Sequence, residues 1–178
     1  MKFNYPILRS CDMVVCAGKS PFATVTRIVT SGWKHFFDRK IAVHTGIIFE
    51  LEGQKLIAEM QPKGLELNSM ERYAKPGGRR WVIAIRRNPA FDSDYSRTTV
   101  QETIALDLRR TLEYDYKGLL EFVSKRIKDN KKRAYCSEYY YQLTKDFVGY
   151  PESFDTKVSP YDLQKIGAGY IDVPGFAV

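Results

Sequence analysis

The sequence contains no apolar run that approaches the roughly 18 residues needed to cross a bilayer. The segment from Met1 to Ser10 also lacks the apolar stretch of a secretory signal peptide. No internal repeat and no low-complexity tract is found along the chain. Because 44% of the 178 residues are hydrophobic, the chain is long and apolar enough to build one core. We therefore expect residues 1–178 to form a single soluble domain that is kept in the cytoplasm.

Cysteine and histidine are also scarce, with three and two residues respectively. The cysteines are odd in number, and their positions do not have the spacing of metal ligands. We therefore expect neither a disulfide framework nor a zinc site, and the sequence indicates no cofactor. Cys11 and Cys16 are interpreted as small core residues, because free cysteine packs like an apolar side chain.

Basic residues outnumber acidic ones, which gives the chain a formal net charge of +7. This charge favours anionic partners, and nucleic acid, acidic lipid and cell-wall polymers all qualify. A nucleic-acid site would interleave aromatic residues with positive charges, whereas here the aromatic residues lie outside the basic run from Lys125 to Arg133. We interpret this run as a solvated loop and expect no nucleic-acid partner. Contact with an anionic membrane surface stays open, and the sequence does not indicate an oligomeric state.

The stretch from Ala134 to Leu143 places a cysteine where a helix is predicted to begin. A thiol at a helix N-terminus lies at the positive end of the macrodipole and near backbone N–H groups without partners, and both lower its pKa. Cys136 is therefore the candidate nucleophile, and a buried structural thiol is the alternative. Glu138 is interpreted as a carboxylate that complements the helix dipole, and the tyrosines at 139–141 as core and rim of the helix.

A hairpin is predicted to carry the candidate base. From Ile41 to Glu50, apolar residues at odd positions alternate with His44 and its small neighbours, which is the pattern of a strand. Glu52-Gly53 predicts a tight turn, and Lys55 to Met60 reads as the returning strand. With a two-residue loop, the residue numbers of cross-strand partners sum to 105. Glu59 then lies diagonal to His44, at about 7 to 8 Å between backbones. A three-residue loop would place Glu59 on the opposite face.

The other elements follow from periodicity and from breaks at proline and glycine. We predict strands at Asp12–Cys16 and Trp81–Ile85, helices at Pro21–Thr30, Thr99–Leu112 and 119–127, a loop over the site at Trp33–Lys40, a connection with a short polar turn at Gly64–Tyr73, a capped turn at Ser159–Leu163 and an edge strand at Tyr170–Val173.

Short motifs occur along the chain in a fixed order. They are Ser10-Cys11-Asp12-Met13-Val14-Val15, Val43-His44-Thr45-Gly46-Ile47, Leu56-Ile57-Ala58-Glu59, Tyr114-Asp115-Tyr116-Lys117-Gly118, Tyr135-Cys136-Ser137-Glu138 and Ser159-Pro160-Tyr161-Asp162-Leu163. This ordered set, with histidine before cysteine, resembles the circularly permuted branch of the NlpC-type papain-like cysteine hydrolases. That branch includes YiiX-like proteins and, more distantly, lecithin:retinol acyltransferase-like enzymes. The resemblance spans about Ser10 to Leu163.

The resemblance implies an α+β fold of the papain-like, permuted NlpC type, in which a small antiparallel sheet packs against helices. It places the nucleophile Cys136 at a helix N-terminus facing the sheet, with His44 carrying the proton and Glu59 orienting the imidazole. Tyr114 resembles the tyrosine that helps to hold the oxyanion, and Tyr116 is the alternative. His35 is the alternative to His44 and lies in an irregular aromatic segment. The chemistry implied is cleavage of an amide or ester bond through a covalent acyl-enzyme.

Three functions therefore compete at this point. The first is a thiol hydrolase that acts on a peptide, cell-wall or lipid-ester substrate. The second is an acyltransferase on the same fold, for which Phe22, Trp33, Phe36 and Phe37 could line an acyl groove. The third is a non-catalytic module that binds an anionic partner, as the net charge suggests.

Overall fold

The computed structural model describes residues 2–31, 38, 40–110, 113–114, 133–155 and 158–177. Its largest sheet is built from β1 (Met13–Gly18), β2 (His44–Leu51), β3 (Gln54–Gln61), β4 (Gly64–Ser69), β5 (Arg80–Arg87) and β8 (Ile171–Asp172). Within the described residues this sheet has six strands in the order β4-β3-β2-β1-β5-β8, and every neighbouring pair is antiparallel. The α+β class expected from the sequence is therefore confirmed.

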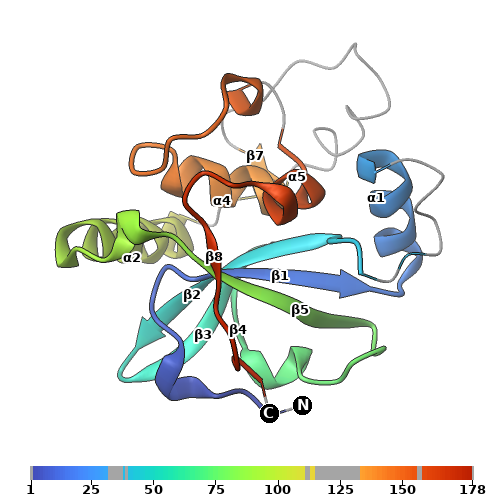
Figure 1. Ribbon diagram of the computed structural model, residues 1–178, viewed down its shortest axis with the longest axis horizontal. Helices are drawn as coiled ribbons and strands as arrows, with labels where there is room; N and C mark the ends of the chain where they lie inside the picture. Colours follow the sequence, from blue (N-terminus) through green and yellow to red (C-terminus); the bar gives the residue numbers. More distant parts are fainter. Residues whose placement is uncertain are drawn as a thin grey trace.

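The helices are α1 (Pro21–Ser31), α2 (Asp94–Arg110), α4 (Cys136–Thr144) and α5 (Pro160–Lys165). Shorter 3-10 turns are η1 (Tyr5–Ile7), η3 (Met70–Tyr73), η4 (Pro89–Phe91) and η5 (Glu152–Asp155), and β6 (Glu113–Tyr114) pairs in parallel with β7 (Arg133–Ala134). Figure 1 shows α1, α4 and α5 on one side of the sheet, with η3 and both chain termini on the other. None of the helices in the described part of the chain combines the length and the apolar character that a membrane span requires.

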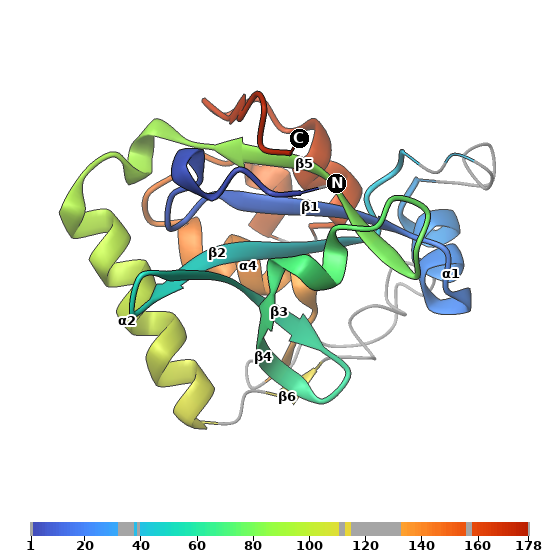
Figure 2. The same cartoon turned by 90° about the horizontal axis from the view of Figure 1, so that it is seen from below.

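The sheet has an apolar core on each face because successive strand residues point to opposite sides. On the side of α4, Met13 and Val15 of β1 and Ile47 and Phe49 of β2 pack against the buried residues of the helix. On the other side, buried residues of the strands contact the N-terminal segment and η3, and they include Val14, Cys16, Ile48, Ile57 and Ile85. Figure 2 views the sheet from this second side, with α4 behind the strands.

The hairpin of β2 and β3 has the register that a two-residue loop predicts. Ile47 pairs with Ala58 and Leu51 with Gln54, so partners sum to 105. Glu52 and Gly53 both have positive φ, at 50° and 76°. Positive φ at both central residues is the conformation that matches the right-handed twist of a hairpin. Glu59 therefore lies on the same face of the sheet as His44.

The segment Gly64–Tyr73 differs from the prediction of a connection with a polar turn. Its first part is the edge strand β4, which pairs with β3 through Leu65 opposite Met60 and Leu67 opposite Ala58. Leu65 and Leu67 alternate with Glu66 and Asn68, which is the period of a strand with one face against a core. The polar residues of the second face, Glu66 and Asn68, hid this period from the sequence interpretation, although both are half-buried beside Glu59.

The boundaries of two other elements differ from those predicted. The strand predicted from Ile41 begins at His44, and the helix predicted for Thr99–Leu112 runs from Asp94 to Arg110. The strands β1, β5 and β8, the helix α1, and the Ser159-capped helix α5 lie where the sequence predicts them, to within a few residues. The helix predicted at 119–127, the segment 32–37 and the basic residues 125–132 lie outside the described residues.

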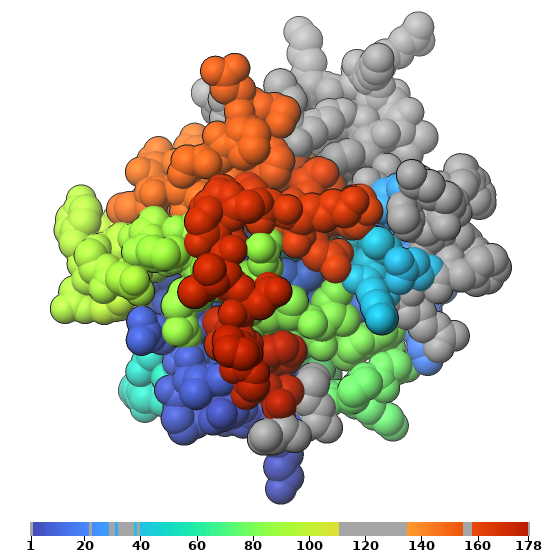
Figure 3. Space-filling view, viewed as in Figure 1, coloured from blue at the N-terminus to red at the C-terminus, as the bar shows by residue number. Residues whose placement is uncertain are grey.

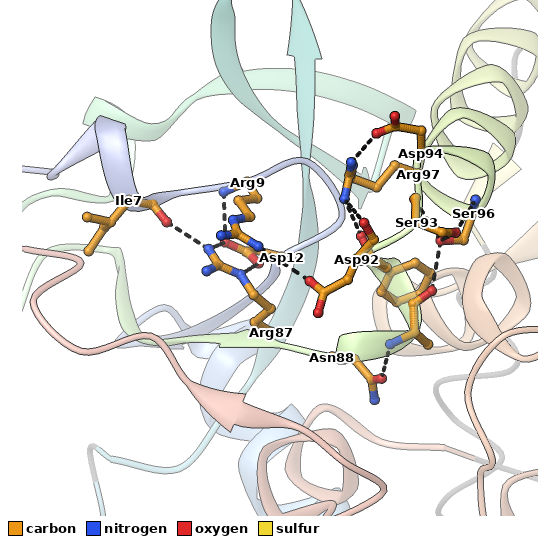
Figure 4. A network of polar contacts seen from close by, with 12 residues as sticks. Ile7, Arg9, Asp12, Arg87, Asn88, Asp92, Ser93, Asp94, Ser96 and Arg97 are labelled. Carbon is orange, nitrogen blue, oxygen red and sulfur yellow. Dashed lines mark hydrogen bonds and ion pairs between the residues drawn. The ribbon is translucent and has the colours of Figure 1, made fainter.

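A partly buried ion pair holds the end of β1 that lies away from His44 (Figure 4). Asp12 accepts hydrogen bonds from Nε and Nη2 of Arg87 at 2.8 and 2.7 Å, and from the backbone N–H of Arg9 at 2.9 Å. Arg87 also donates to the carbonyl of Ile7 at 2.7 Å. The aspartate that heads the first motif therefore ties the N-terminal segment to β1 and β5. The space-filling view shows the C-terminal segment, in red, running down one face to the N-terminal residues (Figure 3).

Candidate functional site

Cys136 is the first residue of α4, as the sequence predicts. The preceding residue, Tyr135, has an extended backbone with φ −97° and ψ 172°, which is the geometry of an N-cap. Glu138 turns back toward the helix start, and its carboxylate accepts from the backbone N–H of Tyr135 at 3.4 Å. Ser137 donates its hydroxyl to the carbonyl of Val158 at 2.8 Å. These contacts fix the first turn, in which the backbone N–H groups have no acceptor inside the helix.

His44 and Glu59 meet across the hairpin, as the even loop predicts. His44 Nε2 is hydrogen-bonded to Glu59 Oε2, and the two side chains are almost completely buried. Because this contact occupies Nε2, the ring nitrogen left for another partner is Nδ1. A hydrogen bond also joins the imidazole of His44 to the sulfur of Cys136. The three residues proposed from distant parts of the sequence are therefore in contact in the order carboxylate, imidazole and sulfur.

The pairing between β2 and β3 stops near the sulfur of Cys136. The ladder between β2 and β3 ends at Ile47 opposite Ala58, short of His44. Ile48 donates its N–H toward β1, to the carbonyl of Asp12 at 2.9 Å, so the N–H of Thr45 points to the other side, toward β3. In place of a strand partner, the Thr45 N–H donates to the sulfur of Cys136. The opened ladder thus brings the end of α4 into hydrogen-bonding contact with β2.

Gly46 permits the close approach of the two strands beside this opening. A Cβ atom at position 46 would lie 2.5 Å from Cγ2 of Ile57 and 3.4 Å from Cβ of Glu59. Real Cβ atoms do not approach other heavy atoms to 2.5 Å, so a larger side chain would push β3 away. Glycine at this position therefore keeps Glu59 within reach of His44.

The charges of the site favour a thiolate next to an imidazolium. Burial acts to raise the pKa of the Cys136 thiol, but the charge of His44, its hydrogen bond and the Thr45 N–H outweigh burial and lower the pKa. Burial and the charge of Arg80 act to lower the pKa of His44, but Cys136 and Glu59 outweigh them and raise it. The two shifts have one cause, because each ionised group stabilises the other.

Three further residues surround Glu59, and the sequence analysis missed all of them. Asn68 of β4 donates to Oε1 at 2.9 Å, and the hydroxyl of Tyr73 at the end of η3 donates to the same oxygen. Arg80, the first residue of β5, forms an ion pair with Oε2 at 3.6 Å. Burial acts to raise the pKa of Glu59, but His44, Tyr73 and Arg80 outweigh it, so this pKa is lowered. Glu59 is thus a buried carboxylate whose two oxygens are both occupied.

Thr45 is a fourth residue to which the sequence analysis assigned no role in the site. It is fully buried, and its hydroxyl Oγ1 has no hydrogen-bond partner in the part of the chain that the structure describes. Leaving a buried polar atom without a partner costs about 1 to 3 kcal/mol. Thr45 is adjacent to His44, and its own N–H donates to the sulfur of Cys136. Its hydroxyl is therefore a free donor on the residue that touches the candidate nucleophile.

The other residues singled out from the sequence have the following places. Cys11 and Cys16 are buried and free, as predicted, and burial raises the pKa of Cys11 to about 12. The tyrosines at 139–141 are buried core residues of α4. The backbone of Tyr114 lies in β6, but its side chain, and all of Tyr116, lie outside the described residues. His35 and the aromatic residues Trp33, Phe36 and Phe37 lie outside them too, as does the side chain of Phe22.

Comparison with known proteins gives a likeness in fold. No protein-family model matches the sequence, and no curated protein matches it. Among solved structures, the metalloprotein YiiX from Escherichia coli O157:H7 is similar, with a TM-score of 0.54 and 15% sequence identity over 80% of this chain and 67% of that chain. This identity supports a shared fold and carries no function across. In the described part of this chain, no group of three or more His, Cys, Asp or Glu residues is arranged to hold a metal ion.

Proposed function

We propose that this protein is a cysteine hydrolase that cleaves an amide or ester bond through an acyl-enzyme on Cys136. The observation that carries the proposal is the arrangement of His44, which is held between the buried carboxylate of Glu59 and the sulfur at the start of α4. Fixing the ring by a carboxylate while the other ring nitrogen faces a nucleophile is the logic of a catalytic triad. The likeness to the YiiX fold supports a papain-like organisation of permuted NlpC type.

In the first step, the Cys136 thiolate attacks the carbonyl carbon of the substrate, and the carbonyl oxygen takes up negative charge. The imidazolium of His44 then donates its proton to the departing nitrogen or oxygen, which leaves a thioester on the sulfur. In the second step, His44 takes a proton from water, the resulting hydroxide attacks the thioester, and the thiolate departs. Glu59 stabilises the imidazolium whenever His44 is protonated, and Arg80 and Tyr73 hold Glu59 in place.

The oxyanion needs donors that point at the reacting carbonyl. Backbone N–H groups in the first turn of α4 have no partner within the helix and lie beside the sulfur. We assign a further donor role to the hydroxyl of Thr45, which has no hydrogen-bond partner in the described part of the chain and belongs to the residue whose backbone N–H contacts the sulfur. A donor of this kind contributes on the order of 3 kcal/mol to catalysis in a water-excluded site. Tyr114 and Tyr116 stay as sequence-based proposals for the same role.

The proposal is tested with a small thiol-directed electrophile such as iodoacetamide, because Cys136 is only 4% exposed. We expect Cys136 to be alkylated near neutral pH, as mapped by mass spectrometry, and the Cys136→Ser variant to lose this label. The Cys11→Ala and Cys16→Ala variants serve as matched controls and should keep it, because burial raises the pKa of both thiols. Labelling that survives in Cys136→Ser at the wild-type rate would contradict the proposal.

A second experiment separates chemistry from reactivity alone. An activated ester such as p-nitrophenyl acetate should acylate Cys136 with release of nitrophenolate, followed by slower turnover as water attacks the thioester. An added amine or alcohol that accepts the acyl group faster than water would favour the acyltransferase alternative. An adduct that never turns over, with or without an acceptor, would show that the thiol is reactive but that the site does not catalyse hydrolysis.

A further inference from the structure

A cavity lies next to the residues that hold Glu59, and two of these residues, Tyr73 and Arg80, line it. Its volume is about 640 Å³, which is within the usual range for small-molecule sites. Neither Cys136, His44 nor Glu59 lines it. Its walls come from Ser20, from the turn after β3, from β4 and η3, and from the Lys75–Arg80 segment that leads into β5.

The lining of this cavity is strongly basic. Among the residues that the structure describes, the carboxylate of Glu66 is the one acidic group in the lining, whereas five side chains are cationic: Lys63, Arg72, Lys75, Arg79 and Arg80. Arg80 is neutralised by Glu59, at 3.6 Å. Within the described ranges of the chain, Lys63, Arg72, Lys75 and Arg79 form no ion pair with a carboxylate.

Like charges that gather around a concave surface repel one another unless an anion joins them. The fold nevertheless brings these side chains together. Gly77, with φ at +73°, allows the tight turn in which Gly78 donates to the carbonyl of Lys75 at 3.0 Å. A Cβ at position 77 would lie 3.2 Å from Nζ of Lys19, so a further ammonium group lies beside the same turn. The arrangement concentrates positive charge around the cavity.

We propose that this pocket binds a phosphoryl group carried by a small organic molecule. Guanidinium groups and ammonium groups together match the several oxygens and the double charge of a phosphate monoester, and arginine pairs with such oxygens in a bidentate manner. The polar side chains of Ser20 and Gln61 supply neutral hydrogen-bonding groups in the same lining.

A nucleic-acid strand fits the pocket less well than a small phosphate ester. Binding of bases would need aromatic side chains exposed as stacking platforms. Of the described residues that line the cavity, Tyr73 alone is aromatic; it is buried, and its hydroxyl donates to Glu59.

The proposal is tested by calorimetric titration of the Cys136→Ser chain with glycerol 3-phosphate, so that the result does not depend on chemistry at the sulfur. We expect saturable binding at one site and no binding of glycerol. Lys75→Ala and Arg79→Ala, at exposed positions, should each weaken binding at least tenfold. Lys145→Ala, an exposed cation outside the pocket, should leave it unchanged.

The source of the phosphoryl group is distinguished by a parallel arm with vesicles. Retention on phosphatidic acid vesicles but not on phosphatidylcholine vesicles, lost in Lys75→Ala and Arg79→Ala, would place the group on a lipid surface. Binding of the soluble ester alone would place it on a free metabolite. The proposal is overturned if neither ligand binds saturably, or if Lys145→Ala weakens binding as much as the two pocket variants do.

Discussion

Replacing Glu59 by glutamine isolates the contribution of the carboxylate to the reactivity of Cys136. Glutamine keeps the size of the side chain and an oxygen that can accept hydrogen bonds, but it removes the negative charge beside His44. In the wild type that charge and its hydrogen bond to the imidazole favour protonated His44. Without it, burial and the positive charge of Arg80 both act against the imidazolium, so the pKa of His44 falls.

The size of the effect follows from the contact that is lost. A hydrogen bond to a charged group contributes about 1.5 to 3 kcal/mol, which corresponds to a factor of roughly ten to a hundred in the equilibrium between protonated and neutral imidazole. The thiolate of Cys136 then loses its cationic partner over the same range, and its pKa rises toward that of an ordinary thiol. We expect alkylation by iodoacetamide at pH 7 to slow by roughly tenfold to a hundredfold. The rate should recover at higher pH, where the thiol ionises without help.

The assay is the rate of Cys136 alkylation as a function of pH, resolved from Cys11 and Cys16 by peptide mass spectrometry. The matched control is Glu66→Gln, because Glu66 is the cross-strand partner of Glu59 and contacts the same Asn68 at 3.4 Å. That variant should keep the wild-type pH profile. Circular dichroism and thermal denaturation establish that each variant is folded, since Glu59→Gln also leaves Arg80 without its carboxylate. A folded Glu59→Gln protein with the wild-type rate and pH profile would refute the reasoning.

Two further predictions test the opened hairpin. Thr45→Val keeps the shape of the side chain but removes the hydroxyl donor. It should slow acylation of Cys136 by p-nitrophenyl acetate by about tenfold to a hundredfold and leave alkylation by iodoacetamide unchanged, because only acylation develops an oxyanion. Equal effects on both reactions would rule out this role of the hydroxyl. Gly46→Ala should lower the free energy of unfolding, measured by urea denaturation, by about 1 to 3 kcal/mol, since the new Cβ would lie 2.5 Å from Cγ2 of Ile57. The control variant Gly149→Ala should lower it much less, because a Cβ at position 149 would have no neighbour within 4 Å.

The pairing of His44 with Glu59 could be predicted from the sequence because it depends on local rules. Strand alternation fixes which face each residue occupies, and the two-residue turn at Glu52-Gly53 fixes the register. The start of α4 at Cys136 was predictable for a similar reason, because helix N-termini have recognisable local signals. The contact between these two units, which lie far apart along the chain, follows from no local rule and was expected only from the family that the ordered motifs resemble.

The surroundings of Glu59 were missed because they depend on an edge strand and on residues that do not stand out singly. Once Gly64–Tyr73 is interpreted as a connection, nothing places Asn68 or Tyr73 beside β3. Arg80 is one of many basic residues in the sequence, and only the pairing of β5 with β1 brings it to the end of the sheet that carries His44. Its charge acts against the imidazolium directly and also holds the carboxylate that favours the imidazolium.

This double action of Arg80 explains why the carboxylate needs so many partners. A buried glutamate facing only a histidine could become neutral by taking the imidazole proton, and the thiolate would then lose its cation. Arg80, Tyr73 and Asn68 keep the negative charge on Glu59 by contacting its two oxygens. The proton on Nε2 therefore stays on His44, and the ring remains an imidazolium whose Nδ1–H is left to face the sulfur and to protonate a leaving group. Arg80, Tyr73 and Asn68, which sequence reasoning overlooks, contact Glu59, and by keeping it charged they keep the imidazole protonated.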